Sequence, residues 1–211
     1  MGMKILALEL STGRGALAWV NQGQAIHSVE WPNDRRNSGP FFEQLETTVR
    51  RFGAPDKILV GLGPGSYAGI RIAISAAIGI AAGGNVELIG YPSVCAMKDA
   101  DDDYVAIGDA RRSSFFFVRV RNAALVGPFE LLDEIELKAR IEETALSVPV
   151  FSSDVLPQVH PRVEQRFPSA EVLAGLASDG RMSFHCQPLE PIYLREPNIT
   201  MPKPLNQESN I

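Results

Sequence analysis

The residues of this chain with the clearest chemical potential form a glycine-rich loop, residues 61–71 (GLGPGSYAGIR), between an apolar run and a helical run. Such a loop can direct backbone N–H groups at an anion, because the start of a helix carries partial positive charge. Glycine equally serves where two backbones pack closely, which is the interpretation we favour here. Ser66 is suited to cap the helix that follows. The candidate loop residues are Gly63, Pro64, Gly65, Ser66, Gly69 and Arg71.

Two nucleotide-binding patterns were tested against this loop. The P-loop pattern fails because no Lys-Ser or Lys-Thr pair follows the glycines. The dinucleotide pattern fits better, since Gly63, Gly65 and Ala68 match G-x-G-x-x-G/A, and Glu87 lies 22 residues beyond Gly65. However, Glu87 falls inside the strand-like run 86–89, and an antiparallel meander precedes the loop. We therefore set the dinucleotide pattern aside.

A second turn with polar residues follows the first apolar run. Glu9, Ser11 and Thr12 lie there, so an acid stands at the start of a turn that contains two hydroxyl groups. The hydroxyls could donate to an anion and the acid could help to hold a metal ion. Hydroxyls that bond their own backbone are the plainer interpretation, because no second metal-holding acid can be identified. We regard these residues as a vestigial phosphate loop.

Composition excludes several functional classes. The protein has 211 residues, 45% of them apolar, and a net charge of −5, so it lacks the basic surface of a main nucleic-acid binder. Cys95 and Cys186 form no CxxC pair and are predicted to be reduced thiols. The histidines form no HxxxH or HExxH pattern, and no GxSxG pattern occurs. No signal peptide or membrane span is recognised, so we expect a cytoplasmic protein.

The order of predicted elements indicates how these residues are positioned. Three strands with short turns, at residues 4–10, 16–20 and 24–31, precede a helix whose apolar residues recur at helical spacing up to Gly53. A strand at 57–62, a helix at 68–84 and a strand at 86–90 follow. The order βββαβαβ is that of the unit repeated in the actin/Hsp70/sugar-kinase architecture, an α/β fold.

The second half of the chain resembles a reduced copy of the first. The acidic segment 100–103 marks a boundary, and strands are predicted at 104–107, 114–120, 125–132 and 148–151, the third broken by Gly127 and Pro128. Helices are predicted from Asp133 to about residue 144 and from Ser169 to residue 177. We therefore divide the chain into a first lobe at 1–99, a reduced second lobe at 100–195 and a polar, extended tail at 196–211.

The predicted helix at 68–84 is apolar on every side apart from Arg71 and Ser75. A helix that covers a sheet normally keeps a polar outer face. Either the second lobe or another subunit must therefore cover this one, and we favour another subunit. A stripe of small residues would permit close helix packing. The candidate interface residues are Phe42, Ile70, Ile72, Ile74, Ala76, Gly79 and Gly83.

Four segments together resemble the TsaB (YeaZ-like) family. They are ILALELST at residues 5–12, GPGSYAGIR at 63–71, DARR at 109–112 and PIYLR at 191–195, in the family's order along nearly the whole chain. The resemblance implies a two-lobe actin-like (ASKHA) fold with an incomplete catalytic apparatus. It also implies a non-catalytic role beside a related catalytic subunit, TsaD, in making threonylcarbamoyladenosine in tRNA.

The resemblance carries further expectations about partners and cofactors. Members of this family pair with TsaD through the helices of the first lobe and can form homodimers through the same surface. A TsaE-like ATPase is a further expected partner, and tRNA is contacted mainly through the complex. No cofactor is required by the chain itself, while ATP or ADP binding within the complex stays open.

The sequence departs from the family pattern at a few positions, and two rival functions stay in view. Glu9 stands where the family has Asp, Ala68 where it has Thr, and Asn37-Ser38 where it often has His-Ser. One rival is a stand-alone ATP-dependent phosphotransferase that would use Glu9 and Asp109 as metal-holding acids. The other is a metallopeptidase, against which the missing histidine pair argues.

Overall fold

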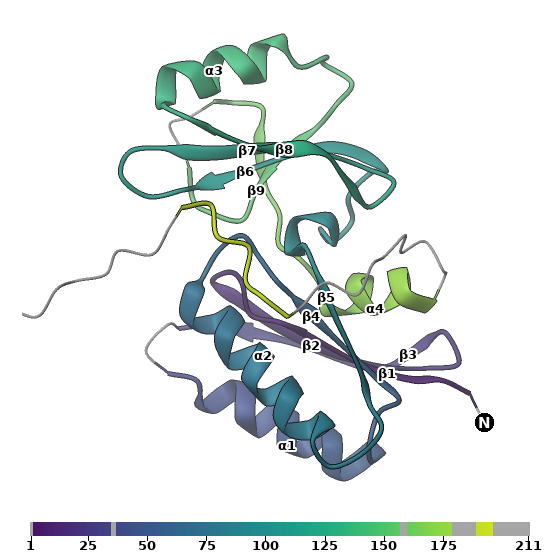
Figure 1. The fold of residues 1–211 in the computed structure, drawn as a ribbon. Helices are drawn as coiled ribbons and strands as arrows, with labels where there is room; N and C mark the ends of the chain where they lie inside the picture. The colour runs from purple at the N-terminus through teal and green to yellow at the C-terminus, as the bar shows by residue number, and fades with distance from the viewer. Residues whose placement is uncertain (1, 35–36, 157–159, 179–188, 196–211) are drawn as a thin grey trace, which may run out of the picture.

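The apolar run at the start of the chain becomes the central strand of a five-stranded sheet (Figure 1). The computed structural model describes residues 2–34, 37–156, 160–178 and 189–195. β2 pairs antiparallel with β1 and β3 with β2, whereas β4 and β5 add parallel strands, so the order is β3-β2-β1-β4-β5. The strands are β1 (Lys4–Glu9), β2 (Arg14–Asn21), β3 (Gln24–Pro32), β4 (Lys57–Gly61) and β5 (Glu87–Tyr91).

Two helices, α1 (Gly39–Phe52) and α2 (Tyr67–Ala81), lie side by side on one face of this sheet (Figure 1). They cover the outward-facing residues of β1, β2 and β4, and the ring of Trp19 stacks on that of Phe52 at 5.4 Å. α2 ends at Ala81, three residues earlier than predicted. Glycines at 83 and 84 follow, and glycine is a poor helix former because it loses the most backbone entropy.

The second lobe repeats the topology of the first. Its strands are β6 (Asp103–Asp109), β7 (Phe115–Arg121), β8 (Ala124–Leu132), β9 (Val150–Ser152) and β10 (Val163–Gln165). Their order, β8-β7-β6-β9-β10, matches β3-β2-β1-β4-β5 position by position. The internal repeat that the sequence suggested is therefore confirmed. α3 (Glu134–Glu143) covers the outer face and begins with a capping box between Asp133 and Glu136.

Two predictions for this second sheet were wrong. β8 runs unbroken through Gly127 and Pro128, because a register shift opposite Phe117 and Arg119 absorbs them. Pro is tolerated there since β8 is an edge strand. The three-residue strand β10 was not predicted, because a run this short carries no periodicity.

The two lobes share one apolar core. Inner-face residues of both sheets, such as Ala18, Tyr104 and Val118, belong to the same buried cluster. α4 (Ala170–Ser178) packs on β1 and β2 of the first sheet, although the sequence assigned it to the second lobe. Residues 189–195, yellow in Figure 1, also return to the first lobe, where the Ile192 N–H donates to the Leu62 carbonyl at 2.9 Å.

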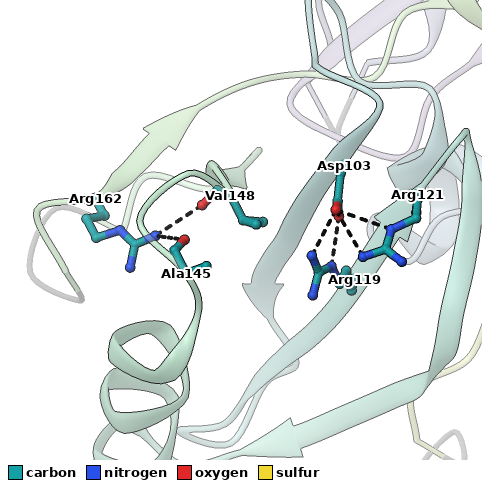
Figure 2. A network of polar contacts seen from close by, with 6 residues as sticks. All are labelled: Asp103, Arg119, Arg121, Ala145, Val148 and Arg162. Atoms are coloured by element: carbon teal, nitrogen blue, oxygen red, sulfur yellow. Dashed lines mark hydrogen bonds and ion pairs between the residues drawn. The ribbon is translucent and has the colours of Figure 1, made fainter.

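Arg162 ties the end of α3 to the turn before β9 (Figure 2). Its guanidinium donates to four backbone carbonyls, at 3.0 Å to Ile141, 2.9 Å to Thr144, 2.9 Å to Ala145 and 3.1 Å to Val148. These carbonyls lie at a helix end and the following turn, where regular helical partners run out. Ile141 and Ala145 each accept one other backbone N–H, from Thr144 at 3.2 Å and from Val148 at 2.9 Å. The guanidinium of Arg162 thus caps the carboxyl end of α3.

Arg162→Ala is expected to lower the free energy of unfolding by about 2–3 kcal/mol, because a charged donor is lost from several acceptors at once. Urea denaturation of both proteins measures the difference. Arg162→Lys keeps the charge but lacks the planar fork, so it should recover little of the loss. If Arg162→Lys has the same free energy of unfolding as the unchanged protein, the positive charge rather than the planar guanidinium stabilises this turn.

Asp103 forms a second polar cluster, near the start of β6 (Figure 2). Its carboxylate accepts two bonds from Arg119, at 2.7 and 2.8 Å, and is shared with Arg121 at 3.1 Å. The Arg119 guanidinium, followed by that of Arg121, lowers the pKa of Asp103 to about 2. The carboxylate therefore stays charged throughout the physiological range and joins β6 to β7 across the strand pair.

Candidate functional site

The glycine loop packs directly on the first turn of the chain. The Ser66 N–H donates to the Ser11 carbonyl at 2.6 Å. A Cβ at Gly65 would lie 2.1 Å from that carbonyl oxygen, and a Cβ at Gly69 would lie 2.2 Å from the Leu10 oxygen. Both contacts are with backbone carbonyl oxygens, which cannot move without a shift of the main chain. Glycine is required here because two backbones meet without room for a side chain.

The hydrogen-bonding groups of this loop are largely used within the chain. The Gly63 N–H donates to Ser93 Oγ at 2.9 Å, and the Gly69 N–H donates to Ser66 Oγ at 3.3 Å. Ser66 is buried and caps α2. Pro64 lines the space between the lobes. The geometry therefore favours a loop that fixes the start of α2 over one that offers its N–H groups to an anion.

Glu9 is fully buried at the end of β1. One carboxyl oxygen, Oε1, accepts from the Ser11 N–H at 2.7 Å. The other, Oε2, has no hydrogen-bond partner among the described residues and lies where a Cβ of Gly61 would be, 1.8 Å from it. Burial raises the pKa of Glu9, and the nearby hydroxyls of Ser11 and Ser93 oppose the rise only in part.

The raised pKa of Glu9 makes the stability of this protein depend on pH. The native state holds the proton more tightly than the unfolded chain, whose carboxyl has a pKa near 4.5. Stability contributed by the neutral carboxyl is therefore complete below pH 4.5 and falls as pH rises toward the native pKa. Glu9→Gln removes this ionisation. Its stability relative to the unchanged protein should increase with pH above 4.5, measured by urea denaturation. A pH-independent difference would contradict the shift.

The structure does not bring Glu9 and Asp109 together as metal-holding acids. Asp109 lines the space between the lobes, where it is paired with Arg111 at 2.9 Å, whereas Glu9 is enclosed beneath the first turn. Within the described ranges, no three His, Cys, Asp or Glu side chains are grouped as metal ligands. Glu87, the acid of the dinucleotide pattern, begins β5 and pairs with Lys57 at 2.9 Å. It is therefore at the amino end of its strand, away from a nucleotide site.

A cleft of about 290 Å³ lies between the two lobes. Segments that are far apart in the sequence meet there, among them the turn with Ser11 and Thr12, the glycine loop, the β6–β7 hairpin and residues 191–195. Thr12 uses its hydroxyl locally, since it accepts from the Arg14 N–H at 3.1 Å, whereas the buried Ser11 hydroxyl has no partner in the described part of the chain. The DARR and PIYLR segments, far apart in the sequence, thus line one site.

The predicted interface residues on α2 divide between two faces of the helix. Ile70 and Ile74 are buried at 1% and 8% exposure against the first sheet, so they cannot contact a partner. Their assignment to the interface was wrong, because they share the face of α2 that packs on β4. Ile72 and Ala76 are half-buried, and Gly83 lies beyond the helix end.

The outer faces of α1 and α2 carry exposed apolar residues. Phe42 is 48% exposed and Ile78 is 51% exposed, while a Cβ at Gly79 would meet nothing within 4 Å. The sequence prediction omitted Ile78. Arg71 and Ser75, the polar residues of α2, are both exposed and therefore mark the outer face of the helix. Position 78 follows them at helical spacing on the same face. Arg71 contacts the ring of Tyr67 at the start of this face. We take the outer face to be defined by Phe42, Arg71, Ser75, Ile78 and Gly79.

Other residues considered in the sequence have structural surroundings. Cys95 is a free, buried thiol whose pKa burial raises to about 12, so it stays protonated. Cys186 and His185 lie outside the described residues. His27 packs beside the Phe52 ring, and His160 accepts from the Arg162 N–H at 3.2 Å. None of the helices in the described parts of the chain is long and apolar enough to span a membrane.

The sequence of this chain is similar to those of proteins involved in tRNA modification. A family model for TsaD, tRNA N6-adenosine threonylcarbamoyltransferase, matches residues 43–128. The Haemophilus influenzae protein named tRNA threonylcarbamoyladenosine biosynthesis protein TsaB is 27% identical over 128 residues, which cover 56% of this chain. That match spans about half of the relative's own length, 54%.

Solved structures agree on the fold. YeaZ from Pseudomonas aeruginosa superposes with a TM-score of 0.70 at 21% identity, over 91% of this chain and 100% of that one. A Pseudomonas aeruginosa protein described as similar to peptidase YeaZ gives a TM-score of 0.71 at 21% identity, over 92% and 100% of the two chains. The actin-like α/β fold predicted from the sequence is thereby confirmed.

Proposed function

We propose that this chain, which is similar to TsaB and YeaZ proteins, acts as a non-catalytic subunit that binds a TsaD-like catalytic subunit. The joint task would be the synthesis of threonylcarbamoyladenosine in tRNA, in the cytoplasm. Contact with tRNA would be made mainly through the complex, with a TsaE-like ATPase as a further partner. The chain itself would require no cofactor.

The observation that carries this proposal is the outer face of α1 and α2. Apart from Arg71 and Ser75, α2 is apolar, and it keeps Ile78 half exposed on the side away from its own sheet. The second lobe lies on the opposite side of the first sheet, against its inner face, and leaves this face of the helices open (Figure 1). Exposed apolar side chains on a helix face favour an interface with another protein. The open position at Gly79 would allow a partner helix to approach the backbone closely.

Co-purification with the TsaD-like protein of the same organism tests the proposal directly. The two purified proteins would be mixed and their mass measured by light scattering. A stable complex with one copy of each protein supports the proposal. The absence of a complex between two well-folded proteins overturns it, and ATP turnover by this chain alone would then support the phosphotransferase.

Self-association through the same face is part of the proposal and can be separated from partner binding. The isolated protein would be measured at several concentrations, where a homodimer raises the scattering mass. If one face serves both contacts, added partner must dissociate the homodimer. A complex in which the partner binds to the intact homodimer would show that the two contacts use different surfaces.

A further inference from the structure

We propose that the cleft between the lobes binds a small organic oxyanion, a phosphate or a carboxylate, through Arg112 and Arg195. The proposal is independent of the subunit role, since the cleft and the outer face of α1 and α2 are different surfaces. It rests on the charge of the cleft, on the guanidinium of Arg112, and on the conformation of the hairpin that carries it.

The cleft is positive although the protein as a whole is negative. Its charged lining residues are three arginines and two aspartates, which sum to +1, whereas the full sequence has a net charge of −5. A concave site with apolar walls concentrates the field of such charges. The lining charges are Asp109, Arg111, Arg112, Asp154 and Arg195.

These charges are not all neutralised within the described parts of the protein. Asp109 is paired with Arg111, and Asp154 accepts from the Asp109 N–H at 2.8 Å. Arg195 donates to the Ser114 hydroxyl, which is uncharged. Arg112 is exposed and forms no ion pair or hydrogen bond with any residue that the structure describes. Among these residues, two guanidinium groups at the cleft therefore lack a counter-charge.

The hairpin that carries Arg112 holds an unfavourable backbone conformation. Arg111, Arg112 and Ser113 are consecutive non-glycine residues with φ of 67°, 55° and 55°. Turns normally place Gly, Asn or Asp at left-handed positions, because a Cβ is unfavourable in that region. Strain of this kind is concentrated at functional sites, where a particular side chain has to be held in place.

The walls of the cleft limit the size of the ligand. Its volume of about 290 Å³ is at the lower end of the usual range for ligand pockets. Ile70, Val94 and Phe116 supply apolar surface, and the ring of Tyr193 packs against that of Tyr67, tilted by 39° with the ring centroids 5.5 Å apart. A small organic anion with a short apolar part fits these dimensions. The Ser11 hydroxyl of the first turn, which has no partner in the described part of the chain, supplies a further polar group.

The test is an NMR titration of the full-length protein with sodium phosphate and, separately, sodium malonate. Sodium chloride at matched ionic strength serves as the reference. We expect amide shifts that saturate at millimolar anion and concentrate in residues 11–13, 109–114 and 191–195. The stronger of the two anions identifies which oxyanion the site prefers. No saturable shift with either anion, or shifts spread over the surface, would overturn the proposal.

Two glycine substitutions separate binding from folding. Arg112→Gly relieves the left-handed strain and removes the guanidinium, so it should raise the thermal midpoint while weakening anion binding about tenfold or more. Ser113→Gly relieves equivalent strain but keeps Arg112, so it should raise the midpoint and leave binding unchanged. Equal affinity in both variants would show that Arg112 does not bind the anion.

Lys138→Gln controls for long-range charge, because it removes one positive charge from α3 at an exposed position outside the cleft. Its affinity for the anion should equal that of the unchanged protein. A loss as large as that of Arg112→Gly would mean that the titration reports net charge alone, and the proposal would fail.

Discussion

Gly79→Arg should weaken the affinity for the TsaD-like subunit by about 100-fold or more, because the complex would bury an unpaired charge at a cost of about 3–5 kcal/mol. The isolated protein should fold normally. A Cβ at position 79 meets nothing within 4 Å, and arginine is a better helix former than glycine. Isothermal titration calorimetry with the purified partner measures the change.

Gly175→Arg is the matched control for this prediction. Gly175 is also a helical glycine with nothing within 4 Å of a Cβ, but it lies in α4, away from α1 and α2. The variant carries the same added charge and the same gain in helix propensity. If Gly175→Arg keeps the affinity for the TsaD-like subunit and Gly79→Arg loses it, the interface lies on the outer face. Equal affinity in both variants would show that the partner binds elsewhere.

Gly69→Ala should lower the free energy of unfolding by about 3 kcal/mol, at the upper end of the cost of overpacking. The added methyl group would lie 2.2 Å from the Leu10 carbonyl oxygen, so the start of α2 must move away from β1. Such a movement also strains the capping bond that the Gly69 N–H donates to Ser66 Oγ.

Gly79→Ala is the counterpart in the same helix and should have the opposite sign. Its methyl group enters open space, so only the helix propensity changes, which stabilises by about 0.5–1 kcal/mol. Urea denaturation of the two variants beside the unchanged protein tests both. If Gly69→Ala is as stable as Gly79→Ala, the glycine loop is not fixed by close packing on the first turn.

Periodicity in the sequence located most of the first lobe. β1 is apolar at nearly every position because both of its faces are covered. The spacing of Leu45, Val49 and Phe52 indicated the buried side of α1, although Phe41 rather than Phe42 is enclosed there. The glycine loop was also placed correctly between β4 and α2. In each case the signal is local, since spacing within one element determines which side is buried.

Other features depend on contacts between distant segments, and there the sequence was insufficient. The near absence of polar residues in α2 hid which side faces the sheet, so Ile70 and Ile74 were placed at the interface and Ile78 was omitted. Likewise, nothing within α4 indicates that it packs on the first sheet. The cleft is formed by segments as far apart as residues 11–13 and 191–195, and single-sequence patterns do not report such proximity.

The return of the chain to its first sheet has a consequence for biosynthesis. A ribosome delivers β1 to β5 well before α4 and residues 189–195, yet α4 covers the inner face of that sheet and the Ile192 N–H donates to the Leu62 carbonyl. N-terminal domains commonly fold while the remainder is still being made. Here the nascent first lobe would keep the inner face of its sheet uncovered until α4 has emerged, although α4 follows the whole second sheet along the chain. The first lobe therefore cannot complete its packing as an N-terminal unit, and its folding is coupled to that of the second lobe.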